Sequence, residues 1–174
     1  MAINFGNNDT QLLPAGIHQI LHFNTTSSTT VQSSTSFANV TGFTNRSITP
    51  KSSTSKILIH ICGTSMSQHG GGGANQEARI LRDGSNIWES NTCGRNNAGH
   101  YHESWTHIMM FDNPATTSAV SYTFQIRESH GNTIVKFNGG DGNLGSGINY
   151  RADMYLIEVG EGALWFLYLH LLDL

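Results

Sequence analysis

The sequence predicts a single all-β domain, a β-sandwich or jelly roll, and three observations support that prediction. Ser (18), Thr (17) and Asn (16) together with 19 Gly make up 70 of the 174 residues, and these residue types favour strands and turns because they compete with helical hydrogen bonding. Apolar side chains recur with a period of two rather than 3.6. Such stretches number eight or more along the chain, a spacing typical of sandwiches and jelly rolls.

The expected strands follow one another through residues 17–160. The clearest alternation is Val120–Ile126, in which every second side chain is apolar. The segment Ile57–Cys62 is apolar on nearly both faces, whereas Ala78–Arg82 leads into Asp83-Gly84, a hairpin signal. Further strands are expected at Ile17–Phe23, Thr29–Ser33, Val40–Ile48, Ile87–Trp88, His102–Phe111, Ile134–Phe137 and Ile148–Val159.

Two segments flank the predicted domain: an N-terminal arm, residues 1–16, and an apolar C-terminal tail, residues 161–174. The tail is apolar on all sides, whereas a half-solvated element would show one apolar stripe, so we expect it to be buried against another chain. The alternative is that it forms the last strand or helix of the domain's own core. A 12-residue helix is about 18 Å long and falls short of the roughly 30 Å bilayer core. The residues expected in the partner interface are Leu164, Trp165, Phe166, Leu167, Tyr168, Leu169, Leu171 and Leu172.

The charge pattern argues against several classes of partner. The net charge is −3, only 12% of residues are charged, and the sequence has no Lys/Arg run, so we expect no nucleic-acid or membrane partner. Residues 1–16 lack the basic start and apolar core of a signal peptide. Cys62 and Cys93 show no CxxC spacing, which indicates two reduced thiols in a protein assembled in a cytosol.

Three stretches could hold a metal or cofactor, and we expect none of them to do so. Gly70–Gly73 lacks the Lys-Ser/Thr that completes a phosphate-binding loop. Asp141 and Asn143 lie in a Gly/Asn-rich loop without the closing acidic ligand of a calcium site. His100 and His102 would project from one face of a strand, with His107 farther along, as half of a metal site. We interpret these three histidines as polar residues on a solvated or interfacial strand.

No catalytic residue is expected either, so the chain is predicted not to be an enzyme. The sequence has no Gly-x-Ser-x-Gly motif between a strand and a helix. Carboxylate pairs form in space, so the sequence alone leaves a glycosidase open. Its acids Glu77, Asp83, Glu103 and Asp112 show no pairing that sequence can establish.

A binding protein for glycans would expose aromatic side chains at one end of the sandwich. The candidates are Trp88, Tyr101 and Trp105. We expect these rings to serve core or oligomer packing, which is the more common use of aromatic side chains.

Four segments of the sequence carry a resemblance to a known module. In chain order they are SITPKSSTSKILIHICG, ARILRDGSNIWES, FDNPATTSAVSYTFQIRES and ADMYLIEVG. They resemble the trimeric C1q/TNF-like jelly-roll module of phage virion proteins, particularly those of cyanophages. The module's turns and strands correspond to Ser47–Leu58, Leu81–Gly84 and Asp112–Thr117, and the resemblance covers about Ile17 to Gly160.

The resemblance implies a fold and a place in the virion more than an activity. Tail-fibre versions of the module follow a shaft, whereas this sequence starts at Met1 close to the module and continues past Gly160 into the tail. It is therefore more similar to a capsid decoration (cement) protein. The expectation is a homotrimer on the outer capsid surface that bridges subunits of the major capsid protein, assembled in the host cytoplasm. Val120–Ile126 and Ile148–Leu156 are the strands expected to supply the trimer's core and interface.

The alternative function is a receptor- or glycan-binding protein, either a tail fibre or a head fibre. The same module occurs in phage tail-fibre heads, so the resemblance is compatible with both functions. Neither function requires a cofactor.

Overall fold

The computed structural model describes residues 16–68, 74–96, 101–129, 134–138 and 150–160, with only the backbone described at 66–68, 74, 92–96 and 101–103. All regular structure in these residues is β-structure, as the composition predicts. The strands are β1 (Ile17–Thr25), β2 (Thr29–Gln32), β3 (Ala38–Asn39), β4 (Arg46–Ile48), β5 (Lys56–Gln68), β6 (Ala74–Arg82), β7 (Ser85–Asn96), β8 (Tyr101–Asp112), β9 (Val120–Glu128), β10 (Ile134–Phe137) and β11 (Ala152–Val159).

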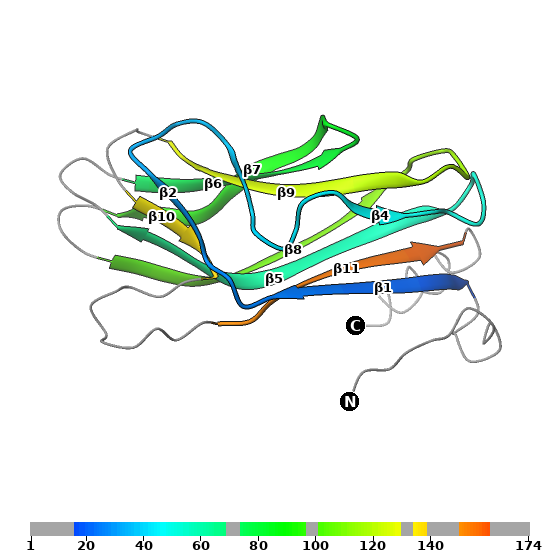
Figure 1. The fold of residues 1–174 in the computed structure, drawn as a ribbon, viewed down its shortest axis with the longest axis horizontal. Helices are drawn as coiled ribbons and strands as arrows, with labels where there is room; N and C mark the ends of the chain where they lie inside the picture. Colours follow the sequence, from blue (N-terminus) through cyan, green and yellow to red (C-terminus); the bar gives the residue numbers. More distant parts are fainter. Residues whose placement is uncertain (1–15, 69–73, 97–100, 130–133, 139–149, 161–174) are drawn as a thin grey trace, which may run out of the picture.

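The strands form two antiparallel sheets that pack face to face as a sandwich (Figure 1). In sheet A the central strand β5 pairs along one edge with β8. Along its other edge β5 pairs first with β11, which continues to β1, and then with β10, which continues to β2. Sheet B has the order β3-β9-β6-β7, with β4 also paired to β9. This arrangement confirms the predicted β-sandwich and is consistent with a jelly roll.

The core lies between the sheets and is filled by the inward side chains of each alternating strand. On β9 these are Val120, Tyr122, Phe124 and Ile126, all buried, as the sequence alternation predicts. The Phe124 ring meets the Phe137 ring of β10 edge-on, with 5.1 Å between ring centroids. Strand β9 therefore supplies the subunit core.

The Asp83-Gly84 hairpin forms as predicted between β6 and β7. Both residues have positive φ, 50° and 84°, which is the geometry of the two-residue turn whose twist matches the flanking strands. Glycine adopts such angles at no steric cost. The turn therefore explains why the sequence carries this dipeptide here.

The prediction of a single strand at Val40–Ile48 is wrong. The chain turns at this point, because the Phe43 amide donates to the Val40 carbonyl (3.0 Å) and Gly42 has φ +88°. Only Arg46–Ile48 pairs again, with β9. Val40, Phe43 and Ile48 are all buried, so the apolar spacing reports burial in a turn rather than a strand.

The first and last strands are neighbours in sheet A. Ile17 lies opposite Val159, and the Gly160 amide donates to the Gly16 carbonyl (2.7 Å). The predicted strand Ile148–Val159 begins in the structure at Ala152. The predicted arm and tail lie outside the described residues, apart from Gly16, but the chain enters and leaves the domain at the same end.

Candidate interaction surface

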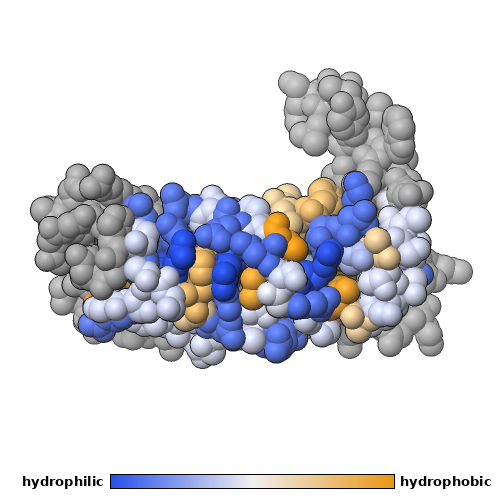
Figure 2. All heavy atoms as spheres, turned by 90° about the horizontal axis from the view of Figure 1, so that it is seen from above, coloured by the Kyte–Doolittle hydropathy of each residue, from blue (hydrophilic) through white to orange (hydrophobic). Residues whose placement is uncertain are grey.

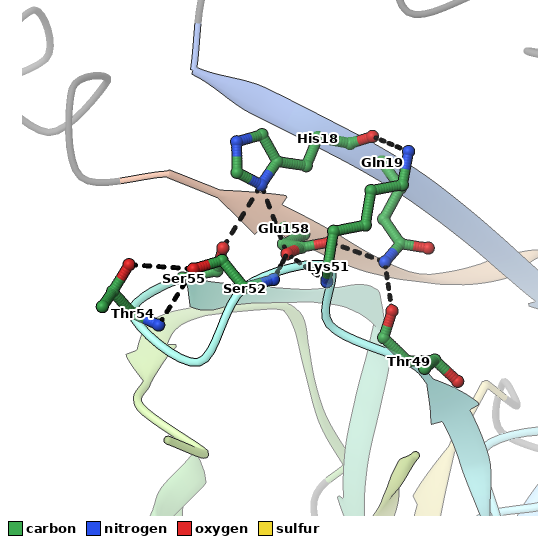
Figure 3. A network of polar contacts seen from close by, with 8 residues as sticks. All are labelled: His18, Gln19, Thr49, Lys51, Ser52, Thr54, Ser55 and Glu158. Atoms are coloured by element: carbon green, nitrogen blue, oxygen red, sulfur yellow. Dashed lines mark hydrogen bonds and ion pairs between the residues drawn. The ribbon is translucent and has the colours of Figure 1, made fainter. Parts of the chain in front are cut away.

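The carboxylate of Glu158 on β11 is the centre of a buried polar cluster (Figure 3). Its side chain is fully buried. It accepts hydrogen bonds from Gln19 Nε2 (2.6 Å) and from the backbone amide of Lys51 (2.7 Å), and His18 Nδ1 lies 3.3 Å away. The cluster joins β1, β11 and the turn that precedes β5.

These hydrogen bonds set the ionisation of Glu158. Burial by itself would raise the pKa of this carboxyl group, because it penalises the charged form. Hydrogen bonds from Gln19, Ser55, Lys51 and His18 together outweigh burial and lower the pKa below its usual value. The ionised carboxylate is therefore a structural clamp on the turn.

The clamp predicts acid sensitivity. With a lowered folded-state pKa, Glu158 contributes stability above about pH 4.5, its ordinary pKa, and that stability is lost as the pH falls through the folded-state value. Glu158→Gln should lower the free energy of unfolding near neutral pH by about 1–3 kcal/mol and flatten its decline in acid. Thermal unfolding followed across pH tests this, with Glu89→Gln at an exposed site as control. An unchanged acid profile in Glu158→Gln would contradict it.

A second cluster is centred on Asp112 at the end of β8. The carboxylate accepts from Arg82 (2.8 and 2.9 Å) and from the Tyr122 hydroxyl (2.7 Å). Burial first, and then the hydrogen bond to Asp112, raises the pKa of Tyr122 far above its usual value, so this hydroxyl stays a donor. Next to it, Asp83 Oδ1 accepts from the backbone amide (2.8 Å) and the hydroxyl (3.0 Å) of Ser121.

The two clusters explain the four motif segments structurally. Lys51 in the first segment is held by Glu158 in the last. Arg82 in the second is held by Asp112 in the third. These motif residues therefore connect segments that are distant in the sequence. Their polar groups form hydrogen bonds and ion pairs within the fold.

The sheet A outer face, which is turned away from sheet B, carries an apolar and aromatic surface. On β8, Trp105, Met109 and Phe111 leave 65%, 67% and 43% of their surface exposed. The strand register aligns the outward side chains of β1, β11, β5 and β8 in rows. One row is Ile20, Ile157, Leu58 and Phe111, the next is His22, Tyr155, His60 and Met109, and the third is Asn24, Asp153, Cys62 and His107.

Four rings form a continuous stack across this face. The His22 and Tyr155 rings lie 4.5 Å apart, Tyr155 and His60 5.9 Å, and His60 and His107 6.1 Å, with interplanar angles of 13°, 18° and 20°. Burial first, and then the neighbouring His107, lowers the pKa of His60. The stack therefore favours the neutral form of that imidazole.

The outer face of sheet B is polar by contrast. The guanidinium groups of Arg79 and Arg127 lie 4.0 and 4.4 Å from the centre of the Phe37 ring. Arg127 also donates to Glu77 (2.6 Å), and Arg79 donates to Gln125 (2.6 Å). Figure 2 looks onto the side of the molecule where β9, β6 and β7 lie and shows mostly hydrophilic residues with smaller hydrophobic patches. The outer face of sheet B therefore has the polar character of a solvent-exposed surface.

The structure brings together only some of the residues singled out in the sequence. His107 and Trp105 lie exposed on the sheet A outer face, whereas Trp88 packs against the core. The strand Val120–Ile126 supplies buried residues to the core, but its outward side chains belong to the polar outer face of sheet B. Outside the described side chains lie His100, His102, Glu103, Tyr101, Cys93, Gly70–Gly73, Asp141, Asn143 and the tail residues Leu164, Trp165, Phe166, Leu167, Tyr168, Leu169, Leu171 and Leu172.

Metal ligands and membrane-spanning helices are considered for the described part of the chain alone. No group of three His, Cys, Asp or Glu side chains suited to a metal ion occurs there. Nor does that part contain a helix with the length and hydropathy needed to cross a membrane.

Most of the sheet A outer face, including His22, His60, Tyr155, Met109 and Phe111, was not predicted from the sequence. A signal for it was present, since Ile57–Cys62 is apolar on both faces although one face of an antiparallel sheet is commonly solvated. In β8 the residues Trp105, His107, Met109 and Phe111 likewise alternate with buried ones.

Comparisons with known proteins give matches among solved structures only. No protein-family model and no curated protein matches the sequence. The chain is similar to a chain of the T13 viral particle of infectious bursal disease virus (11% identity, TM-score 0.37, covering 82% of this chain and 35% of that one). It is also similar to a chain of the Gx strain of that virus (15% identity, TM-score 0.33, covering 83% and 37%). The chain thus spans little more than a third of the chains it matches.

Proposed function

We propose that this protein is a structural virion protein, a C1q/TNF-like jelly roll that assembles as a homotrimer and decorates a phage capsid. It would sit on the outer capsid surface and cement neighbouring subunits of the major capsid protein. The observation that carries the proposal is the contrast between the two faces of the sandwich: the sheet A outer face is apolar and aromatic, whereas the sheet B outer face is polar and internally paired. The motif resemblance supplies the virion context.

Other copies of the chain are the partners that suit the sheet A outer face. Burying a large apolar side chain contributes about 1.5–3 kcal/mol, so Trp105, Met109 and Phe111 alone favour association. Soluble oligomers are mostly closed and symmetric, and the resembled module is trimeric. Strand β11 contributes Tyr155 and Ile157 to this face, and Tyr155 lies within Ile148–Leu156, the strand expected to supply interface.

The size of this face leaves a role for the tail. Four strands spaced about 4.8 Å apart and three rows spaced about 7 Å apart cover roughly 400 Å², while a typical stable interface buries about 800 Å² per partner. The sheet A outer face therefore suits the centre of an interface. Leu164, Trp165, Phe166 and the rest of the apolar tail would add area between subunits or against the capsid. Attachment by three subunits would add avidity.

We include no catalysis in this function. Glu77 and Asp112 are paired with arginines, and Asp83 is held by Ser121. These acids serve the fold in contacts already described. A role in bridging capsid subunits needs only surfaces that bury area.

A receptor- or glycan-binding function is the second candidate, and one observation favours it. Trp105 is 65% exposed and its ring lies 6.4 Å from that of Tyr150, edge to face. Exposed aromatic rings are common in carbohydrate contacts. Copy number separates the two functions: a shell protein is present in hundreds of copies per virion, and a tail-tip protein in a handful.

Deleting residues 163–174 tests the proposed function. The truncated protein should fold, because β11 ends at Val159 and is paired on both edges, with β1 and β5. It should lose incorporation into capsids or lose trimer stability. Circular dichroism and a binding assay on capsids that lack the protein measure the two effects, with His170→Ala in the full chain as the control. A truncation that folds and decorates capsids at full occupancy would show that the tail is not the anchor, and one that misfolds would place the tail in the core.

A further inference from the structure

The stacked rings of the sheet A outer face place two histidines at the centre of the proposed trimer contact. His60 on β5 lies between Tyr155 on β11 and His107 on β8, with ring centroids 5.9 and 6.1 Å away. Met109 lies directly opposite His60 on β8. Titration of His60 would therefore change the charge of this surface at its middle.

The charged groups around this stack leave His60 without a carboxylate partner among the described residues. Asp153 on β11 is the acid on this face, and it already accepts from His22 on β1 (2.6 Å) and from Arg151 (2.9 Å). The other titratable groups that face His60 are Cys62 and Lys56 on its own strand and Tyr155 on β11. A proton taken up by His60 would thus add positive charge without a partner to neutralise it.

Protonating both imidazoles would place two positive charges about 6 Å apart. Repulsion at that distance grows as water is removed, so the pair opposes burial when charged and permits it when neutral. Burial and His107 already lower the pKa of His60 in the single subunit. Contact with further subunits would remove more water from the same ring.

Given the homotrimer proposed above, on which this inference rests, we infer that the sheet A outer face is an acid-sensitive contact. The trimer is stable while His60 is neutral, and it dissociates into folded subunits when His60 takes up a proton beside His107. The pKa of His60 is already lowered in the single subunit by burial and by His107, and removal of more water in the trimer would lower it further. The trimer therefore keeps its full stability above the subunit's lowered value and loses stability as the pH falls below it. One trimer holds three copies of His60, so the losses accumulate.

Sedimentation of the full chain at about pH 7.5 and about pH 5.5, with a chelator in both buffers, tests this inference. The lower pH stays above the range in which Glu158 loses its charge. We expect the dissociation constant of the wild-type trimer to rise at least about tenfold at the lower pH, with the circular dichroism of a folded β-protein retained. The double variant His60→Phe, His107→Phe keeps rings that can stack but cannot titrate, so its dissociation constant should stay constant within about threefold.

A matched control is His18→Gln, a histidine on β1 that contacts Glu158 rather than the stack. It should dissociate in acid as the wild type does. A monomer at about pH 7.5 would contradict the proposed trimer itself. A trimer of equal affinity at both pH values would leave the trimer standing and overturn the inference. Acid dissociation in the double variant, or loss of the folded signal in the wild type at about pH 5.5, would overturn it as well.

Discussion

Replacing Leu58 with aspartate should convert the proposed trimer into folded monomers. Leu58 lies on β5, the central strand of the sheet A outer face, directly between Ile157 on β11 and Phe111 on β8. An aspartate there would have to leave water to be buried in the trimer, and an unpaired buried charge costs several kcal/mol. In the single subunit the same side chain lies at the surface, so the substitution should reduce the stability of the subunit far less than it reduces the stability of the trimer contact. Sedimentation should show a species of 19.0 kDa instead of one three times as heavy.

Two companion variants distinguish loss of the contact from loss of the fold. Phe111→Asp changes a more exposed side chain in the same row and should also give monomers. Leu81→Asp places the same charge on the outer face of sheet B and should leave the proposed trimer intact. If Leu58→Asp and Phe111→Asp remain trimeric with wild-type affinity, the trimer contact lies elsewhere on the subunit.

Replacing Asp112 with alanine should destabilise the subunit by about 2–3 kcal/mol, because it removes a charge-assisted contact with the partly exposed Arg82 and the acceptor of the buried Tyr122 hydroxyl. The Asp112 side chain is only 10% exposed and accepts from both Arg82 and Tyr122. Its removal would leave the buried Tyr122 hydroxyl without its acceptor. Arg82, whose side chain is 30% exposed, would keep only the Asn113 carbonyl (3.2 Å). Chemical denaturation at neutral pH measures the change.

Tyr122→Phe is the matched variant for this cluster. It removes the hydroxyl but keeps the ring in the core, so we expect a loss of only about 1–2 kcal/mol. The double variant should lose less stability than the two single variants lose together, because the Tyr122 hydroxyl has no acceptor left once Asp112 is gone. Strict additivity would mean that the hydrogen bond between Tyr122 and Asp112 contributes nothing.

Local patterns in the sequence predicted much of the fold because strands and tight turns depend on neighbouring residues. The period-two pattern of Val120–Ile126 and the Asp83-Gly84 pair both appear in the structure as expected. Val40–Ile48 was predicted wrongly because buried residues in a turn can imitate the spacing of a strand. Gly42 was the available signal that the chain turns there.

The candidate surface depends on pairings between distant parts of the chain, which local patterns do not encode. His22, Tyr155 and His60 share a row only because β11 lies between β1 and β5 in one register. A shift of one residue in that register would turn His60 into the core and Ile59 outward. The Glu158 clamp is equally remote in sequence, since its partner Lys51 is 107 positions away. Sequence could indicate amphipathic strands, but not which of their faces would meet.

The central position of β11 has a consequence for how the protein is made. Because β11 pairs with both β1 and β5, β1 cannot join sheet A until β11 has left the ribosome. Folding must then wait for pairing between strands more than a hundred residues apart, and topologies dominated by such distant contacts fold slowly. A nascent chain that stops before Ala152 would expose unpaired edges of both β1 and β5, so only a chain that includes β11 can close sheet A.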